Sequence, residues 1–97
     1  MAETVATIGA RRGLHGRPAA LFAVRASRPD ARAIEVARAD EPAATWYPAH
    51  SVIDLLALDL ARGERIALRT VRTDAEPVLK ELVAMLESDL DDGGHGP

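Results

Sequence analysis

Gly13-Leu14-His15-Gly16-Arg17-Pro18-Ala19-Ala20 is the stretch that decides the fold, because it predicts where the first helix begins. Pro18 suits the first turn of a helix, where its missing N–H would have no acceptor anyway. His15 and Arg17 are therefore expected at or beside the helix N-terminus, where backbone N–H groups and the helix dipole favour an anion. The dipole also favours the neutral, nucleophilic imidazole, and a guanidinium fork fits phosphate oxygens. The pattern predicts a histidine that can accept a phosphoryl group and release it.

The composition describes a small globular domain. Of the 97 residues, 47% are hydrophobic and 28% are charged, which is typical of a chain that builds one core. The formal net charge of −3 argues against generic binding to nucleic acid or to an anionic membrane. We expect one domain over residues 1–92 and a disordered tail over residues 93–97.

The sequence lacks cysteine, long apolar runs and the features of a signal peptide, which argues against cysteine-dependent sites, membrane insertion and secretion. It contains no cysteine, which excludes disulfides, a thiolate nucleophile and cysteine-ligated zinc. We expect neither a metal site nor a cofactor. No apolar run approaches the ~20 residues that a membrane-spanning helix needs, and residues 1–4 lack the regions of a signal peptide. We therefore expect a cytoplasmic protein that does not insert into a membrane, and we expect a monomer.

Short β-branched or alternating segments predict four strands. They cover residues 4–8, 33–38, 45–47 and 65–71. Ile34 and Val36 are expected to face the core, and Pro48 is expected to end the third strand. The second and third strands are expected to pair as a hairpin across a turn at residues 39–42.

Apolar spacing predicts three helices, from residue 17 to about 28, from 52 to about 60, and from a capping box at 73–76 to about 89–91. Ser51 is a good N-cap for the second helix, and Gly63 is the expected left-handed residue beyond its end. The buried face of the first helix is expected to contain Ala19, Phe22, Ala23 and Ala26. The third helix carries a broad apolar stripe from Val78 to Leu90.

The predicted order is βαββαβα. An α+β open-faced sandwich is the economical packing for this order, with a four-stranded antiparallel sheet covered on one face by three helices.

The stretch from Gly13 to Ala19 also resembles the active-site signature of HPr, the histidine phosphocarrier of the bacterial phosphoenolpyruvate-dependent sugar phosphotransferase system. The resemblance implies the same open-faced sandwich over essentially residues 3–90. It implies that His15 takes a phosphoryl group from enzyme I and passes it to enzyme IIA components, with the family using Nδ1 as the acceptor. Gly16, Arg17 and Pro18 would then surround the phosphate, and His15 and Arg17 would carry the transfer. Many relatives have a residue with a side chain in place of Gly16.

The resemblance further implies a partner-docking surface of Ala20, Val52, Ile53 and Leu56, of which we expect at least one of the last three to be buried. Many relatives surround this surface with lysines. Here Val24, Ser27 and Asp54 supply none, whereas Arg11 and Arg12 add charge in the loop before His15. The partners could therefore differ from those of other members.

Ser51 aligns with the regulatory serine that a kinase phosphorylates in HPr proteins of low-GC Gram-positive bacteria. The surrounding match is weak, because His50 replaces a lysine and both Asp54 and Asp59 stand where the family often has glycine. Phosphate on Ser51 would also lie near the acidic Asp54. Its role as an N-cap is sufficient reason for the serine.

Three alternatives to the carrier stay open. An HPr-like regulatory module would act by docking alone, although such modules lack the histidine that this chain keeps. A histidine phosphatase would need an arginine where Leu14 stands, and a longer chain. A domain of a larger multiphosphoryl protein is the third.

Overall fold

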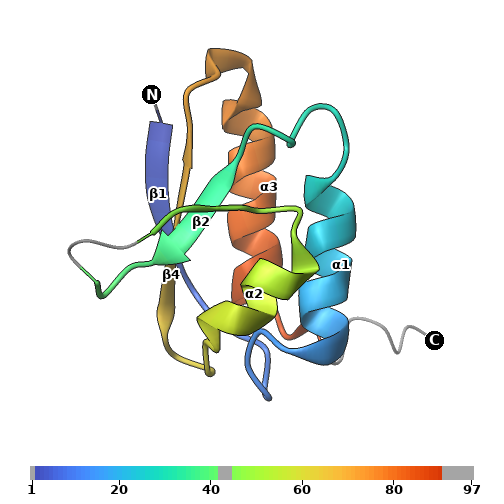
Figure 1. The fold of residues 1–97 in the computed structure, drawn as a ribbon, viewed down its shortest axis with the longest axis vertical. Helices are drawn as coiled ribbons and strands as arrows, with labels where there is room; N and C mark the ends of the chain where they lie inside the picture. The colour runs from blue at the N-terminus through green and yellow to red at the C-terminus, as the bar shows by residue number, and fades with distance from the viewer. Residues whose placement is uncertain (1, 42–44, 91–97) are drawn as a thin grey trace.

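The computed structural model describes residues 2–41 and 45–90, and these residues form a sheet covered by helices on one face (Figure 1). The predicted tail and part of the predicted turn at 39–42 lie outside the described residues. The elements in chain order are β1 (Ala2–Thr7), α1 (Gly16–Ala26), β2 (Glu35–Arg38), β3 (Tyr47–Pro48), α2 (Val52–Leu58), β4 (Arg65–Thr70), the 3-10 turn η1 (Thr73–Ala75) and α3 (Glu76–Glu87).

The strands pair in the order β1-β4-β2-β3, and every pairing is antiparallel. Between sheet and helices lies a core that includes Ile34, Val36 and Leu68, none of which is exposed. The predicted face of α1 is confirmed: its members Ala19, Phe22, Ala23 and Ala26 are all buried. The fold is the predicted α+β open-faced sandwich.

The third strand differs from the prediction, because β3 is Tyr47–Pro48 and not residues 45–47. Tyr47 pairs with Val36 and Pro48 with Glu35. The strand does end at Pro48, as predicted, but Pro48 itself belongs to it. β3 lies at the edge of the sheet. A proline is tolerated on an edge strand, where its missing N–H costs no ladder hydrogen bond.

The second helix is shorter than predicted, since α2 ends at Leu58. Asp59 is its left-handed C-terminal residue, with φ 51° and ψ 51°. Gly63 also has a positive φ, of 89°, but it lies in the later turn that leads into β4. The early end brings Leu60 into the core, where it is fully buried.

The predicted capping box at Thr73–Glu76 is wrong. The chain first makes the single turn of η1, so Thr73 lies inside that turn and does not cap the helix. The residue at the N-cap of α3 is Ala75, whose side chain has no hydrogen-bonding group. Pro77 does lie in the first turn of α3, as predicted.

An arginine joins α1 to α3 at the C-terminal end of α1. Arg25 donates to both carboxylate oxygens of Glu81 on α3 and to both of Asp30, with Nη2–Oε1 at 3.0 Å and Nη1–Oδ1 at 3.0 Å. The Arg25 side chain is only 14% exposed. These bonds to Arg25 hold the pKa of Glu81 and the pKa of Asp30 below their ordinary values, and they raise the pKa of Arg25.

Candidate functional site

His15 is the N-cap residue of α1, which agrees with its expected place at or beside the helix N-terminus, although the helix begins at Gly16, one residue earlier than predicted. Its backbone is extended, with φ −130° and ψ 162°, and its side chain makes no capping hydrogen bond. The ring is 40% exposed, so one edge can be reached from solvent. The preceding Leu14 is buried, which anchors the segment in the core and leaves the histidine at the surface.

The first turn of α1 contains the three residues predicted to surround a phosphate. Gly16 has φ 52°, a conformation that glycine adopts without strain, and a Cβ there would meet no atom within 4 Å. Arg17 is exposed, and Pro18 is buried and has no N–H to contribute. This turn contains no acidic residue. It therefore keeps the amide groups and positive dipole end that favour an anion.

Asp59 is the neighbour of His15 to which sequence reasoning gave no role. Its Oδ1 lies 3.3 Å from Nε2 of His15, and its side chain is 83% exposed. The signal in the sequence was an aspartate where the resemblance suggests glycine. Nothing local to either residue predicted the contact, because the two belong to different segments of the chain.

The four residues predicted to dock partners all lie at the surface. Ala20 is exposed on α1, and on α2 Val52 is 37% exposed, Ile53 75% and Leu56 41%. The expectation that one of these α2 residues would be buried is wrong, because Leu55 and Leu58 supply the buried side of this seven-residue helix.

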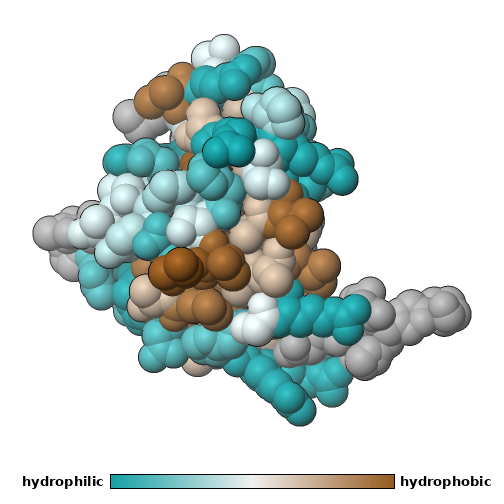
Figure 2. All heavy atoms as spheres, turned by 45° about the vertical axis from the view of Figure 1, so that its right-hand side comes forward, coloured by the Kyte–Doolittle hydropathy of each residue, from teal (hydrophilic) through white to brown (hydrophobic). Residues whose placement is uncertain are grey.

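Hydrophobic side chains extend from α2 onto α1. Leu21 is 38% exposed and Val24 65%, and Figure 2 shows the hydrophobic residues gathered over this face. A shallow hollow of about 270 Å³ lies between the two helices and is lined by Ala20, Val24 and His50 among others. An apolar surface beside an exposed histidine is suited to a partner that must approach the ring.

Ser51 is the N-cap of α2, as predicted. Its Oγ accepts a hydrogen bond from the N–H of Asp54 at 3.3 Å. Phosphorylation of this serine stays a prediction. The modification would replace a hydroxyl group that already has a structural hydrogen bond.

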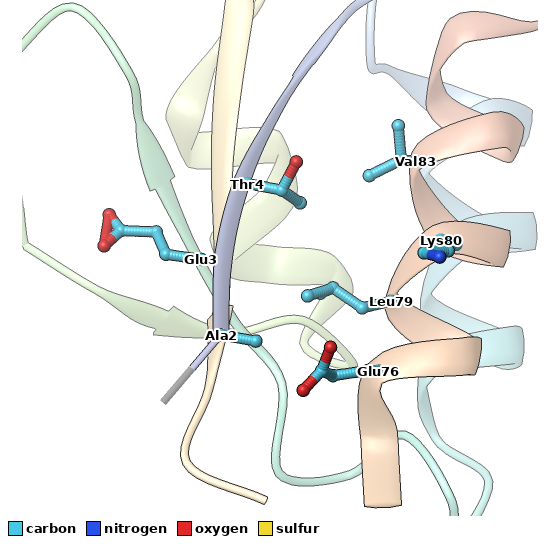
Figure 3. Close-up of a pocket in the computed structure, with 7 residues that line it drawn as sticks. All are labelled: Ala2, Glu3, Thr4, Glu76, Leu79, Lys80 and Val83. Atoms are coloured by element: carbon cyan, nitrogen blue, oxygen red, sulfur yellow. The ribbon is translucent and has the colours of Figure 1, made fainter. Parts of the chain in front are cut away.

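A second hollow of about 270 Å³ lies between β1 and α3 (Figure 3). Leu79 and Val83 of α3 point toward β1 there, and Glu76 lies beside them. This hollow shares no residue with the surroundings of His15. Within residues 2–41 and 45–90, no cluster of three or more histidine or acidic side chains could hold a metal ion. Within the same residues, no helix is long and apolar enough to span a bilayer.

Comparison with known proteins identifies the family. A family model described as the PTS HPr component phosphorylation site matches residues 2–88. The phosphocarrier protein HPr of Streptomyces coelicolor is 33% identical over 92 residues, covering 95% of each chain.

Solved structures agree in fold. HPr-C-His from Thermoanaerobacter tengcongensis superposes with a TM-score of 0.77 at 32% identity, over 94% of this chain and 97% of that one. HPr from Bacillus anthracis gives a TM-score of 0.74 at 27% identity, over 88% and 95%. The chain therefore belongs to the HPr family of the phosphotransferase system, whose members are phosphocarrier proteins and not enzymes.

Proposed function

We propose that this protein carries a phosphoryl group on His15, which it accepts from phosphorylated enzyme I and passes to enzyme IIA components of a sugar phosphotransferase system. The observation that carries the proposal is the half-exposed ring of His15 at a helix N-terminus that has no acidic residue in its first turn. Arg17 would supply a guanidinium to the phosphate oxygens, and the amides of Gly16 and Arg17 would face the same anion.

The transfer needs positioning and charge stabilisation more than covalent machinery. An imidazole that gains a phosphoryl group holds it in a phosphoramidate bond, which breaks readily when the ring is a good leaving group. A buried histidine could not exchange the group with two different partners. The exposure of His15 supports a carrier of this kind.

The direct test is to mix the protein with phosphoenolpyruvate and enzyme I and to measure the intact mass. We expect one acid-labile, base-stable adduct, which His15→Ala abolishes. His50→Ala is the matched control and should keep the adduct, because His50 precedes the N-cap of α2 and does not lie at the N-terminus of α1. Absence of an adduct on the wild-type protein would refute the carrier function and leave the docking module.

We propose the surface formed by Ala20, Val52, Ile53 and Leu56 as the docking site for both partners. Ile53→Ser should raise the KM for phosphorylated enzyme I and leave kcat nearly unchanged, since it removes contact area away from the reacting ring. Val71→Ser is the control, because Val71 is equally exposed, at 73% against 75%, but follows β4. Equal effects of the two variants would contradict docking on α2.

This assignment places the protein with its partners in the cytoplasm, where phosphoenolpyruvate is available. We expect it to work as a monomer, because each exchange needs the ring of one molecule to face one partner.

A further inference from the structure

Asp59, the C-terminal capping residue of α2, has a left-handed backbone conformation. Among residues 2–41 and 45–90 it is the one non-glycine residue with a positive φ. Such a conformation is uncommon for a residue with a side chain, although aspartate and asparagine tolerate it best. Glycine would end α2 with less strain. Helix termination alone therefore does not require an aspartate at this position.

Hydrogen bonds on both sides of Asp59 fix its position relative to His15. The carbonyl of Leu58 accepts from Nη1 of Arg38 at 2.6 Å. The carbonyl of Leu60 accepts from the N–H of Leu14 at 2.8 Å, so the residue before His15 is joined to the residue after Asp59. Leu14 and Leu60 are both buried. Two anchored neighbours thus hold the exposed pair together.

The next residues along the chain reinforce the same segment. Glu64 accepts the N–H of Ala61 at 2.7 Å and Nη2 of Arg38 at 2.8 Å. The bond from the Ala61 amide, followed by that from Arg38, holds the pKa of Glu64 below its ordinary value. The chain that carries Asp59 is therefore tied down both before and after the contact.

We propose that Asp59 is a positioning residue for His15, whose carboxylate accepts a hydrogen bond from Nε2–H and so leaves the lone pair of Nδ1 to take the phosphoryl group. The proposal rests on the proposed function for its consequence in transfer. The evidence for the contact itself is the distance of 3.3 Å between Nε2 and Oδ1 and the anchored backbone around it, which do not depend on the proposed function.

Phosphoryl transfer from the donor to Nδ1 of His15 needs no further reactant. Nδ1 attacks phosphorus with its lone pair, the bond from phosphorus to the donor breaks, and the electron pair of that bond stays on the donor. The proton of Nε2 stays where it is, so the ring becomes a phosphorylated imidazolium. Its new positive charge then lies against the carboxylate of Asp59. When the group leaves for the next acceptor, the electron pair returns to Nδ1 and the charge is lost.

The exposure of the Asp59 carboxylate determines how strongly it can affect His15. The carboxylate is 83% exposed, so solvent weakens the interaction to that of a surface ion pair, which corresponds to roughly a two- to fivefold effect. Asp59 therefore tunes the site and is not required for it.

Two variants separate hydrogen bonding from charge. Asp59→Asn keeps an oxygen acceptor and a side chain that tolerates a positive φ, whereas Asp59→Gly removes the side chain and suits the backbone. Both should therefore fold, and a melting curve checks this. Glu3→Gln on β1 is the control for the loss of one negative charge.

The measurement is the ratio of the two neutral tautomers of His15 by ¹⁵N NMR at alkaline pH, with the ring signals assigned through His15→Ala. We expect the Nε2–H form to dominate in the wild type, in Asp59→Asn and in Glu3→Gln. In Asp59→Gly the share of the Nδ1–H form should rise roughly two- to fivefold. An unchanged ratio in Asp59→Gly would overturn the proposal, whatever the transfer rate.

Transfer from phosphorylated enzyme I gives the second readout. We expect the rates to fall in the order wild type, Asp59→Asn and Asp59→Gly, over a total of roughly two- to fivefold. Phosphorylation on Nε2 of the wild-type ring would also overturn the proposal. A wild-type protein that takes no phosphoryl group but shows the predicted tautomer shift would refute the carrier function and keep the contact.

Discussion

The two ends of α1 each carry a polar contact between side chains, and the two contacts are built in opposite ways. At the C-terminal end, Arg25 is 14% exposed and bonds two carboxylates, and its positive charge is favourable beside the negative end of the helix dipole. At the N-terminal end, His15 and Asp59 are 40% and 83% exposed and share one contact. Arg17 adds a positive charge where the dipole disfavours one. The first end stabilises the fold, whereas the second leaves the ring of His15 accessible from solvent.

The largest effect is expected from a substitution at the N-terminal end of α1, and it concerns activity. Arg17→Gln should slow phosphoryl transfer by about 10- to 1000-fold, taking the lost charge-assisted contact as about 1.5–4 kcal/mol. A melting curve checks that the variant stays folded. Arg28→Gln, beyond the other end of the same helix, is the control in stopped-flow transfer assays. Equal rates for the two variants would show that the N-terminal end has no special role.

The next effect concerns the loop that places His15. Gly13 has φ 83°, and a Cβ there would come within 2.5 Å of the carbonyl oxygen of Leu60 and 3.2 Å of Cδ2 of His15. Gly13→Ala should therefore lower the free energy of unfolding by about 2–4 kcal/mol, from backbone strain and overpacking together. Denaturant unfolding measures this.

Gly63→Ala is the control for Gly13→Ala. Gly63 has a similar φ of 89°, but a Cβ there would meet no atom within 4 Å. Its cost should be strain alone, about 1–2 kcal/mol. A loss as large as that of Gly13→Ala would show that packing against Leu60 does not matter.

The smallest effect is expected at the C-terminal end of α1, where replacing Arg25 should change stability and not activity. Arg25→Met keeps most of the aliphatic length but loses the bonds to Glu81 and Asp30, so the melting temperature should fall without a change in transfer rate. Because folding lowers the pKa of both carboxyls, their contribution is complete above the ordinary values of 4.5 and 3.8 and is lost as the pH falls through the lowered values. The gap in melting temperature between wild type and variant should therefore be full at neutral pH and narrow below about pH 4.5. A gap that stays constant with pH would assign the loss to packing.

Local features of the sequence predicted most of the fold and the centre of the site. Pro18 and the apolar spacing after it placed the start of α1 to within one residue and predicted its buried face, which is confirmed. The side of α2 that faces the core could not be predicted, because apolar residues occupy both sides of this short helix. Leu55 is buried and Ile53 exposed only because of where the sheet and α1 lie.

The two side-chain contacts at the ends of α1 could not be predicted for a related reason. Each joins residues that are far apart in the sequence, His15 with Asp59 and Arg25 with Glu81. Hydrophobic periodicity reports which face of an element is buried, but it does not report which charged side chains meet when the elements pack. The end of α2 at Leu58 was missed because we expected Gly63 to be the left-handed residue beyond the helix, whereas Asp59 takes this conformation.

The proline in β3 has a consequence for how molecules meet in a crowded solution. An exposed strand edge invites another chain to extend the sheet through backbone hydrogen bonds. At this margin the strand is only Tyr47–Pro48, and its second residue has no N–H to donate. Two copies that meet at this edge cannot form a continuous ladder of backbone hydrogen bonds. The edge of β3 therefore disfavours self-association of a molecule that also exposes hydrophobic side chains on α1 and α2.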